Sequence, residues 1–334
     1  MNSTFIIAEA GANHNRDFDL ALKLIDAAVT AGSDAVKFQT YSSETLYSKN
    51  TPDFSFHANI PELIKGIELP REWQSKLKKH CDDKNIEFMS TPFDERAIEE
   101  LYNLGVKRYK IAGFEATDPR FVKLVAQTGL PIILTAGIGT NIGMIGLIKK
   151  WIHEENPTCD LTILHGNNAY PTPFHDINLG QIRLIKENYP NLKVGLSDHT
   201  EGVLVPPIAV ALGAVVIEKH FTLNRALKGP DHHFAIEPEQ LKLMVSNIRI
   251  VEKCLGTKAF ITESEKREMK AMRSVVVKEA MKKSGVFGID KITTKRPRLE
   301  NSIPAIDFYK ILGKKATRDL HADDILMMND VEGF

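Results

Sequence analysis

The sequence predicts an α/β protein with a (β/α)8 barrel of the TIM-barrel type, followed by a small second domain. Between residues 5 and 256, short apolar segments alternate with amphipathic helical patterns, and eight such strand–helix units follow one another. This number of units and the length of the region match a (β/α)8 barrel. The alternative is a doubly wound sheet, but no Gly-x-Gly-x-x-Gly sequence follows any predicted strand.

Each predicted strand is a short run of apolar and β-branched residues bounded by turn-forming residues. The first run is followed by polar residues, and the third is closed by a proline. The predicted strands are 5–8, 35–40, 86–93, 108–112, 131–137, 161–166, 194–199 and 215–221.

The predicted helices have apolar residues three or four positions apart, and glycines such as Gly32, Gly105 and Gly129 follow several of them. One predicted helix contains Pro206 and Pro207, which we expect to bend or restart it. The helices are expected at 20–31, 72–84, 94–104, 119–128, 143–155, 177–188, 203–212 and 238–255.

Residues 41–70 interrupt the alternation, because they are rich in Ser, Thr, Asn and Pro and show no regular period. Only the stretch 61–69 contains a short apolar run. A long segment without regular structure is usually functional in a compact domain, and a substrate lid is one interpretation. A tolerated surface insertion is the other.

The end of the chain differs from the barrel region. We predict a catalytic barrel at 1–256, a charged linker at 257–273 and a small domain at 274–334. The charge run in the linker is typical of a solvated helix or linker. The small domain begins with a predicted strand at 274–277 and then shows short apolar stretches and turn signals.

The composition excludes several classes of function. Lys and Arg together number 43, as do Asp and Glu, so the chain has no charge excess that favours nucleic acid or an anionic membrane. No apolar run approaches a membrane span, and the first residues do not form a signal peptide. The cysteines are scattered, which predicts a reducing, cytoplasmic location. They are Cys81, Cys159 and Cys254.

Polar residues follow or end every predicted strand. In a (β/α)8 barrel the carboxyl ends of the strands form the active site, so these residues are expected to meet there. The set comprises Glu9, Lys37, Gln39, Ser90, Thr91, Lys110, Glu115, Thr135, His165, Asn168, Tyr170, Ser197, Asp198, His199, Glu218 and His220.

The cations and neutral donors of this set predict an anion site. Lys37 and Lys110, with hydroxyl and amide donors around them, suit a phosphate or a carboxylate. Either lysine has a structural alternative, in which its aliphatic part covers the barrel rim. A Schiff base on Lys110 is a third interpretation.

Two histidines at neighbouring strand ends, His199 and His220, predict a metal site with open positions for water and substrate. The alternative for each is a packed or hydrogen-bonded histidine. Glu9 or Asp231 is expected to handle protons. His232 and His233 are expected to belong to a loop that closes the site. Metal binding by this pair is the weaker interpretation, because adjacent residues in an extended segment point in opposite directions.

Several stretches of the barrel resemble the sialic acid synthase family, and two stretches of the tail resemble the C-terminal antifreeze-like (SAF) domain of that family. The tail stretches are Thr294-Lys-Arg-Pro297 and Leu312-Gly-Lys-Lys-Ala-Thr-Arg-Asp319. Those of the barrel are Ile7-Ala-Glu-Ala-Gly-Ala-Asn-His14, Val36-Lys-Phe-Gln-Thr40, Ser90-Thr-Pro-Phe93, Tyr109-Lys-Ile-Ala112, Tyr170-Pro-Thr-Pro173, Gly195-Leu-Ser-Asp-His-Thr200, Glu218-Lys-His-Phe-Thr222 and Gly229-Pro-Asp231.

The resemblance implies a fold, a reaction and residue roles. It implies a barrel with an antifreeze-like α+β tail that condenses phosphoenolpyruvate with an N-acetylated amino sugar. His199 and His220 match ligands of a divalent metal, manganese first, with magnesium or cobalt as alternatives. Arg296 matches an arginine that reaches the partner's site in a domain-swapped homodimer. The catalytic positions matched are Glu9, Lys37, Glu115 and Asp231, and the substrate-binding ones are Gln39, Thr91, Lys110, Thr135, Asn168, Tyr170 and Ser197.

The resemblance leaves the sugar open. Phe114 is typical of the pseudaminate type of synthase, whereas Gly-Pro-Asp231-His is typical of the sialate and legionaminate types. N-acetylmannosamine and a diacetamido trideoxyhexose are therefore both candidate substrates. A Schiff-base aldolase that uses Lys110 and a non-catalytic sugar-binding protein are the alternatives of other classes.

Overall fold

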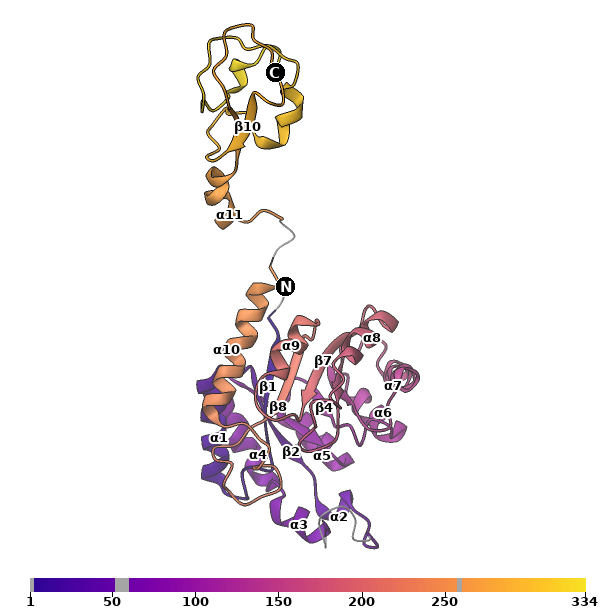
Figure 1. The fold of residues 1–334 in the computed structure, drawn as a ribbon. Coiled ribbons are helices and arrows are strands. Elements are labelled where there is room, and N and C mark those ends of the chain that lie inside the picture. Colours follow the sequence, from indigo (N-terminus) through magenta and orange to yellow (C-terminus); the bar gives the residue numbers. More distant parts are fainter. Residues whose placement is uncertain (1–2, 52–59, 257–259) are drawn as a thin grey trace. The chain divides into compact units, whose positions relative to one another are not determined.

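The computed structural model of the chain describes residues 3–51, 60–256 and 260–334. The chain forms two compact units, Met1–Gly256 and Thr257–Phe334 (Figure 1). Parts of two predicted segments, 52–59 of the lid and 257–259 of the linker, lie outside the described residues. No helix in the described part of the chain has the length and apolar character of a membrane span.

The first unit is a ring of eight parallel strands, which confirms the predicted barrel. The hydrogen-bonded order is β3-β2-β1-β8-β7-β6-β5-β4, and β3 and β4 also lie side by side. The strands are β1 Phe5–Gly11, β2 Ala35–Thr40, β3 Glu87–Pro92, β4 Tyr109–Ile111, β5 Ile132–Ala136, β6 Leu161–Gly166, β7 Lys193–Asp198 and β8 Val216–His220.

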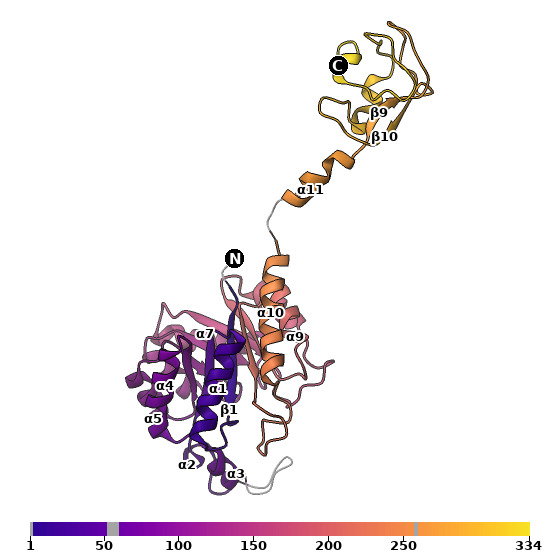
Figure 2. The ribbon, with the colours of Figure 1, turned by 90° about the vertical axis from the view of Figure 1, so that its left-hand side faces the viewer.

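Helices surround this ring, and α1 and α10 lie side by side in both views of the ribbon (Figures 1 and 2). Aspartates and an asparagine cap several of them, as Asp17, Asp94, Asp118 and Asn141 do for α1, α5, α6 and α7. The helices are α1 Phe18–Ala31, α2 Ser43–Leu46, α3 Ile60–Ile67, η1 Arg71–Trp73, α4 Gln74–Asp83, α5 Glu95–Leu104, α6 Pro119–Gln127, α7 Ile142–Glu155, α8 Gly180–Asn188, α9 Val205–Ala211 and α10 Pro238–Cys254.

Some predicted boundaries were wrong. The helix expected at 203–212 begins only at Val205, because the two prolines occupy its first turn, where a proline has no hydrogen bond to lose. The first strand continues to Gly11, since it pairs with β2 and β8 on both sides.

The segment 41–70 also differs from the prediction of an irregular loop, because its described residues, 41–51 and 60–70, include the helices α2 and α3. Contacts distant in sequence hold this segment: Ser43 Oγ donates to Pro61 O at 2.7 Å, and Tyr41 Oη to Ile67 O at 3.3 Å. The two helices have only four and eight residues, which is too short for a stable isolated helix, so tertiary contacts decide their formation.

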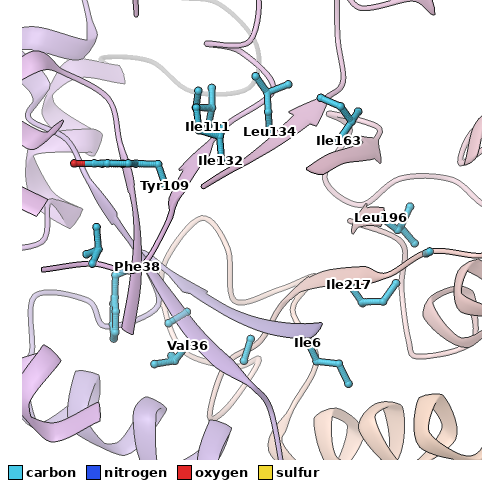
Figure 3. Packing of buried hydrophobic residues seen from close by; sticks show 14 of the residues in the cluster. Ile6, Val36, Phe38, Tyr109, Ile111, Ile132, Leu134, Ile163, Leu196 and Ile217 are labelled. Atoms are coloured by element: carbon cyan, nitrogen blue, oxygen red, sulfur yellow. The ribbon is translucent and has the colours of Figure 1, made fainter. Parts of the chain in front are cut away.

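The main core lies between the strands and the surrounding helices. Because side chains alternate along a strand, every second strand residue points outwards to the helices. Figure 3 draws some of these residues around the strands, and those that it labels, from Ile6 on β1 to Ile217 on β8, are all buried.

A second apolar cluster fills the interior of the ring. Its members come from six different strands, and each is at most 6% exposed. We call this cluster the apolar layer. It consists of Ile7, Ala35, Met89, Ile133, Leu164 and Val216.

The second unit has its own apolar core and little regular structure. Strands β9 Ser274–Val277 and β10 Ile292–Lys295 are antiparallel, and the first confirms the strand predicted at 274–277. The remaining elements are α11 Glu263–Glu268, η2 Met269–Ala271, η3 Ala305–Ile311 and η4 Met328–Asp330. The core residues are Val275, Val277, Phe287, Ile292, Ile303, Ile311, Ala316, Leu320, Leu326 and Val331.

Candidate active site

The barrel interior changes character two residues beyond the apolar layer. Since strand side chains alternate with a period of two, the residue two positions further along points to the same interior. On five of the six strands that residue is polar or charged, and each of the five is at most 4% exposed. We call this set the polar layer. It consists of Glu9, Lys37, Thr91, Thr135 and Glu218.

Lys37 is the centre of one half of the polar layer. Its Nζ lies 2.9 Å from Glu9 Oε2 and donates to Thr91 Oγ1 at 2.8 Å. Gln39 Nε2 donates to the other oxygen of Glu9 at 2.8 Å. Three neighbouring strands thus hold the four side chains that the sequence predicted for this region.

Glu218 joins both predicted lysines. Its carboxylate lies 3.7 Å from Lys37 Nζ and 3.4 Å from Lys110 Nζ, and it accepts a hydrogen bond from Ser197 Oγ at 3.2 Å. Glu218 was among the polar strand-end residues, but the sequence assigned it no role. The signal was present, because Glu218 and the predicted ligand His220 are two residues apart on one strand.

Burial and charge act in opposite directions on the two carboxyls. Burial raises the pKa of Glu9 to about 7 in spite of the nearby Lys37. Burial alone would also raise the pKa of Glu218, but Lys110 and Lys37 together lower it. The Glu218 carboxylate is therefore ionised near neutral pH, and it faces the Nζ atoms of Lys37 and Lys110. Burial lowers the pKa of Lys110, but in its protonated form two ammonium groups face this one carboxylate. Such a site attracts an anion.

His199 and His220 lie together at the ends of β7 and β8, with their ring centroids 5.4 Å apart. His199 Nδ1 is 2.6 Å from the carbonyl oxygen of Asn167, while the buried His220 Nδ1 has no hydrogen-bond partner among the described residues. Burial lowers the pKa of both rings, so both are neutral near pH 7 and each has a lone pair to offer.

The donor set fits a metal that is held by two imidazoles and keeps open positions. Neutral imidazole binds manganese, iron, cobalt and zinc, and His220 Nδ1 is a buried nitrogen for which the described residues offer no partner. Asp231 Oδ2 lies 3.8 Å from that nitrogen. Within residues 3–51, 60–256 and 260–334, no three His, Cys, Asp or Glu side chains are grouped to hold a metal. Substrate and water would have to supply the remaining ligands.

Loops after β5 and β6 cover one side of the histidines. The Tyr170 ring lies 4.2 Å from that of His199 and is 41% exposed. Asn168 Oδ1 accepts from Ile138 N at 2.8 Å, and a Cβ at Gly137 would collide with the same oxygen. The predicted substrate residue Asn168 therefore also joins two loops, which fixes the position of its side chain.

Asp231 and Glu115 are the remaining predicted acids. Asp231 lies beside Gly11, where a Cβ would be 3.0 Å from its Oδ2, and burial raises its pKa to about 6. Burial also raises the pKa of Glu115 to about 7. Glu115 and Phe114 contribute to the lining of a cavity of about 680 Å³ beside the strand ends.

Other polar residues from the sequence have structural roles or lie elsewhere. His165 Nε2 is 2.6 Å from Ile177 O, and His232 is bonded to Thr222 and Asn15, so both are satisfied within the fold. Arg296 is exposed and follows β10 in the second unit, whereas the other predicted site residues belong to the barrel.

Unsatisfied polar atoms concentrate at the carboxyl ends of the strands. In the described part of the chain, seven buried side-chain atoms have no hydrogen-bond partner, and six of them lie at strand ends or in the following loops. Two of the six, Glu9 Oε2 and Glu218 Oε2, are held in ion pairs with Lys37 Nζ, at 2.9 and 3.7 Å. The other four belong to Asn13, Glu115, Thr135 and His220. Buried polar atoms without partners are rare in proteins and call for a ligand or water.

Known proteins are similar to this chain in sequence and in fold. Residues 24–260 match the NeuB family and residues 272–332 match the SAF domain. The chain is 37% identical to the N,N'-diacetyllegionaminic acid synthase of Campylobacter jejuni, over 98% of this chain and 99% of that protein. It is 36% identical to a pseudaminic acid synthase of the same species, over 98% and 96% of the two chains.

A solved structure of a related synthetase has a similar fold. The chain is similar to the N-acetylneuraminic acid synthetase of Leptospira borgpetersenii in complex with citrate, with a TM-score of 0.74 and 34% identity. The similarity covers 80% of this chain and 90% of that one.

Proposed function

The chain belongs to the NeuB family, and on that premise we propose that it is a transferase that condenses phosphoenolpyruvate with an acetamido sugar and water. The products are a nine-carbon 2-keto acid and phosphate. The sugar is N-acetylmannosamine or a related compound. The observation that carries this proposal is that Glu218 of the polar layer joins two buried lysines at the end of the barrel where a pair of neutral histidines lies.

Phosphoenolpyruvate suits the lysine side of the site. Its phosphate and carboxylate are both anionic, and Lys37 and Lys110 are buried cations whose ion-pair partners, among the described residues, are Glu9 and Glu218. Thr135 Oγ1 is a buried hydroxyl without a partner in the same part of the chain, so it is free to donate to a bound oxyanion. Thr91, Ser197, Asn168 and Tyr170 complete the proposed contacts.

The sugar aldehyde belongs on the histidine side. We assign His199 and His220 as ligands of a divalent ion, manganese first, with magnesium or cobalt as alternatives. When bound, such an ion polarises the aldehyde oxygen as a Lewis acid. Gln39, Glu115 and Asp231 are the proposed sugar contacts, because they lie around the same mouth of the barrel.

The reaction then needs two bonds formed and one broken. C3 of phosphoenolpyruvate bonds to the aldehyde carbon, whose oxygen takes up a proton, and we assign Asp231 as the donor. Water adds to C2 and gives up a proton, for which Glu9 is the proposed base. The bond between C2 and the phosphate oxygen then breaks, and the hydroxyl at C2 becomes the keto group as its proton leaves with the phosphate. Lys37 and Lys110 stabilise the charge on the departing phosphate.

Two relatives support an alternative sugar that fits the comparisons equally well. The legionaminic and pseudaminic acid synthases that resemble this chain match it over nearly its full length. A legionaminate or pseudaminate synthase that uses a diacetamido trideoxyhexose is therefore the second candidate. The reaction is the same in both cases, and the scattered cysteines favour the cytoplasm as its location.

The decisive experiment measures phosphate release from phosphoenolpyruvate with manganese. N-acetylmannosamine and the two diacetamido trideoxyhexose precursors are offered separately, and the product mass is determined. We expect a rate that EDTA abolishes, with one sugar, and a product of nine-carbon mass. Folded, metal-loaded protein that releases no phosphate with any of these sugars would exclude the proposed substrates.

Two controls separate the other classes of function. If the protein is a synthase, the His199→Ala variant should lose turnover. If it only binds sugar, the same variant should keep its affinity for the sugar. A Schiff-base aldolase would be trapped on Lys110 by borohydride in the presence of substrate and would resist EDTA. Covalent trapping without a metal requirement would replace the proposed mechanism.

We also propose a domain-swapped homodimer in which Arg296 contacts the N-acyl group in the site of the other subunit. The resemblance to the sialic acid synthases supports this proposal. Mixing Arg296→Ala and His199→Ala subunits tests it, because a hybrid dimer then contains one intact site. Recovery of activity on mixing is expected, and its absence in hybrids of proven composition contradicts the swap.

A further inference from the structure

An ion pair lies directly behind the two histidines. Asp198 and Lys219 are opposite each other in the register of β7 and β8, and so are Ser197 and Glu218. Ser197 and Glu218 are bonded to each other inside the barrel, and the alternation of side chains therefore turns Asp198 and Lys219 to the outside of the ring. Each member of the pair directly precedes one of the histidines.

The pair is fully enclosed and has directed contacts. Lys219 Nζ lies 2.7 Å from Asp198 Oδ2, and the side chains are 2% and 0% exposed. Asp198 Oδ1 accepts from the backbone N and from Oγ1 of Thr200, at 3.0 and 2.8 Å. Lys219 Nζ donates also to the carbonyl oxygen of Thr200. These bonds hold the chain on both sides of His199.

Stability alone gives no reason for such a pair at this position. Removing two charges from water is costly, and apolar residues of similar volume often replace a buried ion pair with equal or higher stability. Apolar residues, however, form no directional hydrogen bonds. The bonds from Lys219 to Asp198 and Thr200 fix the position of residues 198–200 relative to β8, and therefore the backbone positions of His199 and His220.

Independent contacts orient the His199 ring itself. Its Nδ1 lies 2.6 Å from Asn167 O, and its carbonyl oxygen accepts from Thr172 N at 2.9 Å. These contacts connect His199 to the loop after β6, whereas the ion pair connects it to β8, the strand of His220. Within the described residues, the Asp198–Lys219 pair is the side-chain bond between the two strands on their outer face.

We propose that Asp198, Lys219 and Thr200 form a positioning network that sets His199 and His220 at the separation a divalent ion requires. The inference rests on the proposed metal site and adds residues that touch neither metal nor substrate. Partners that orient metal ligands from behind typically change metal affinity by about 10–100-fold when they are replaced. The network is therefore expected to control the affinity for manganese.

The test uses the full-length protein and manganese alone. Asp198→Asn with Lys219→Met removes both charges together, so no buried charge is left without a partner. We expect a folded protein, judged by circular dichroism and thermal unfolding, that binds Mn²⁺ about 10–100-fold more weakly in a titration of free Mn²⁺ by electron paramagnetic resonance. Folded double variant with wild-type affinity overturns the proposal.

The other end of β7 offers a matched control. Lys193 Nζ and Asp160 Oδ2 are also 2.7 Å apart, but their side chains are 55% and 53% exposed and lie at the opposite end of the strand. Asp160→Asn with Lys193→Met makes the same chemical change there. Its Mn²⁺ affinity should equal that of the wild type. An equal loss in both double variants would show that the effect is not positional and would overturn the proposal.

A milder variant covers the case in which the double variant fails to fold. Thr200→Val removes one hydrogen bond to Asp198, introduces no charge and is expected to weaken Mn²⁺ binding by several-fold. Unchanged affinity of folded Thr200→Val then overturns the proposal. If the wild type itself binds no Mn²⁺, the proposed metal site fails and this inference fails with it; tight wild-type binding with unaffected variants overturns this inference alone.

Discussion

The apolar layer and the polar layer are built on the same strands and differ by only two residues in position. Ile7 and Glu9, or Met89 and Thr91, follow the same alternation and point into the same interior. The apolar layer is packed closely, since a Cβ at Gly195 would lie 2.6 Å from Leu164 Cδ2. The polar layer instead contains charges and a buried hydroxyl, Thr135 Oγ1, that has no partner among the described residues.

This difference indicates that one layer mainly stabilises the fold and the other mainly binds ligands. The apolar layer and the outer core remove apolar surface from water, which stabilises the fold. Buried charges and unpaired polar atoms do the reverse, and they persist only where the rest of the structure fixes them. We therefore expect replacements in the apolar layer to change stability and those in the polar layer to change activity.

The largest effect is expected in the apolar layer. Met89→Ala removes a fully buried side chain, and we expect the free energy of unfolding to fall by about 2–5 kcal/mol in urea denaturation. Activity of the protein that remains folded should stay close to that of the wild type. Met89→Leu keeps the volume and should lose less than about 1.5 kcal/mol. Strong loss of activity in a stable Met89→Ala variant would contradict the expectation that the apolar layer affects stability and the polar layer affects activity.

Replacement of Lys110, which contacts Glu218 of the polar layer, should change the rate of the reaction more than the stability of the fold. Lys110→Met removes a buried cation from the proposed phosphate site, and kcat/KM for phosphate release should fall by about 10²–10³-fold. Stability should suffer less than in Met89→Ala, because Glu218 keeps Lys37 at 3.7 Å. Lys107→Met, at an exposed position three residues earlier, is the control and should retain activity. Comparable losses in the two variants would remove Lys110 from the site.

The sequence predicted the strands and most of the polar layer for one reason. Strand residues alternate locally, so a polar residue at the end of an apolar run is visible without knowledge of the fold. Lys37 and Thr91 of the polar layer were found in this way, as was His220 at the end of β8, and the structure brings them to one end of the barrel. Their proposed roles come from the family and remain predictions.

What the sequence missed depends on contacts between distant residues. The local pattern placed Glu218 at a strand end, two residues before His220, but its contacts with Lys37 and Lys110, which precede it by more than a hundred residues, follow only from the fold. The contact of Ser43 with Pro61 of α3 likewise follows only from the fold. The start of α9 at Val205 was a local failure, because two prolines mark the first turn of a helix as well as a break in one.

The smallest effect concerns Glu115, whose burial raises its pKa from 4.5 to about 7. Between these values the folded protein keeps a proton that the unfolded chain releases. The free energy of unfolding should therefore fall as the pH rises from about 4.5 to about 7 and change no further above that. Urea denaturation of the wild type and Glu115→Gln at pH 5, 6 and 7 measures this contribution.

The amide of the Glu115→Gln variant does not titrate, so this variant should show a shallower decline, with a difference on the order of 1 kcal/mol because Glu115 is partly exposed. Other buried acids, Glu9 and Asp231, act in the same direction, and only the difference between the two curves reports on Glu115. Glu99→Gln, at an exposed position of α5, should leave the wild-type curve unchanged in shape. Parallel curves for Glu115→Gln and the wild type would mean that the Glu115 carboxyl is already ionised in the folded protein, and that water reaches it through the cavity beside Phe114.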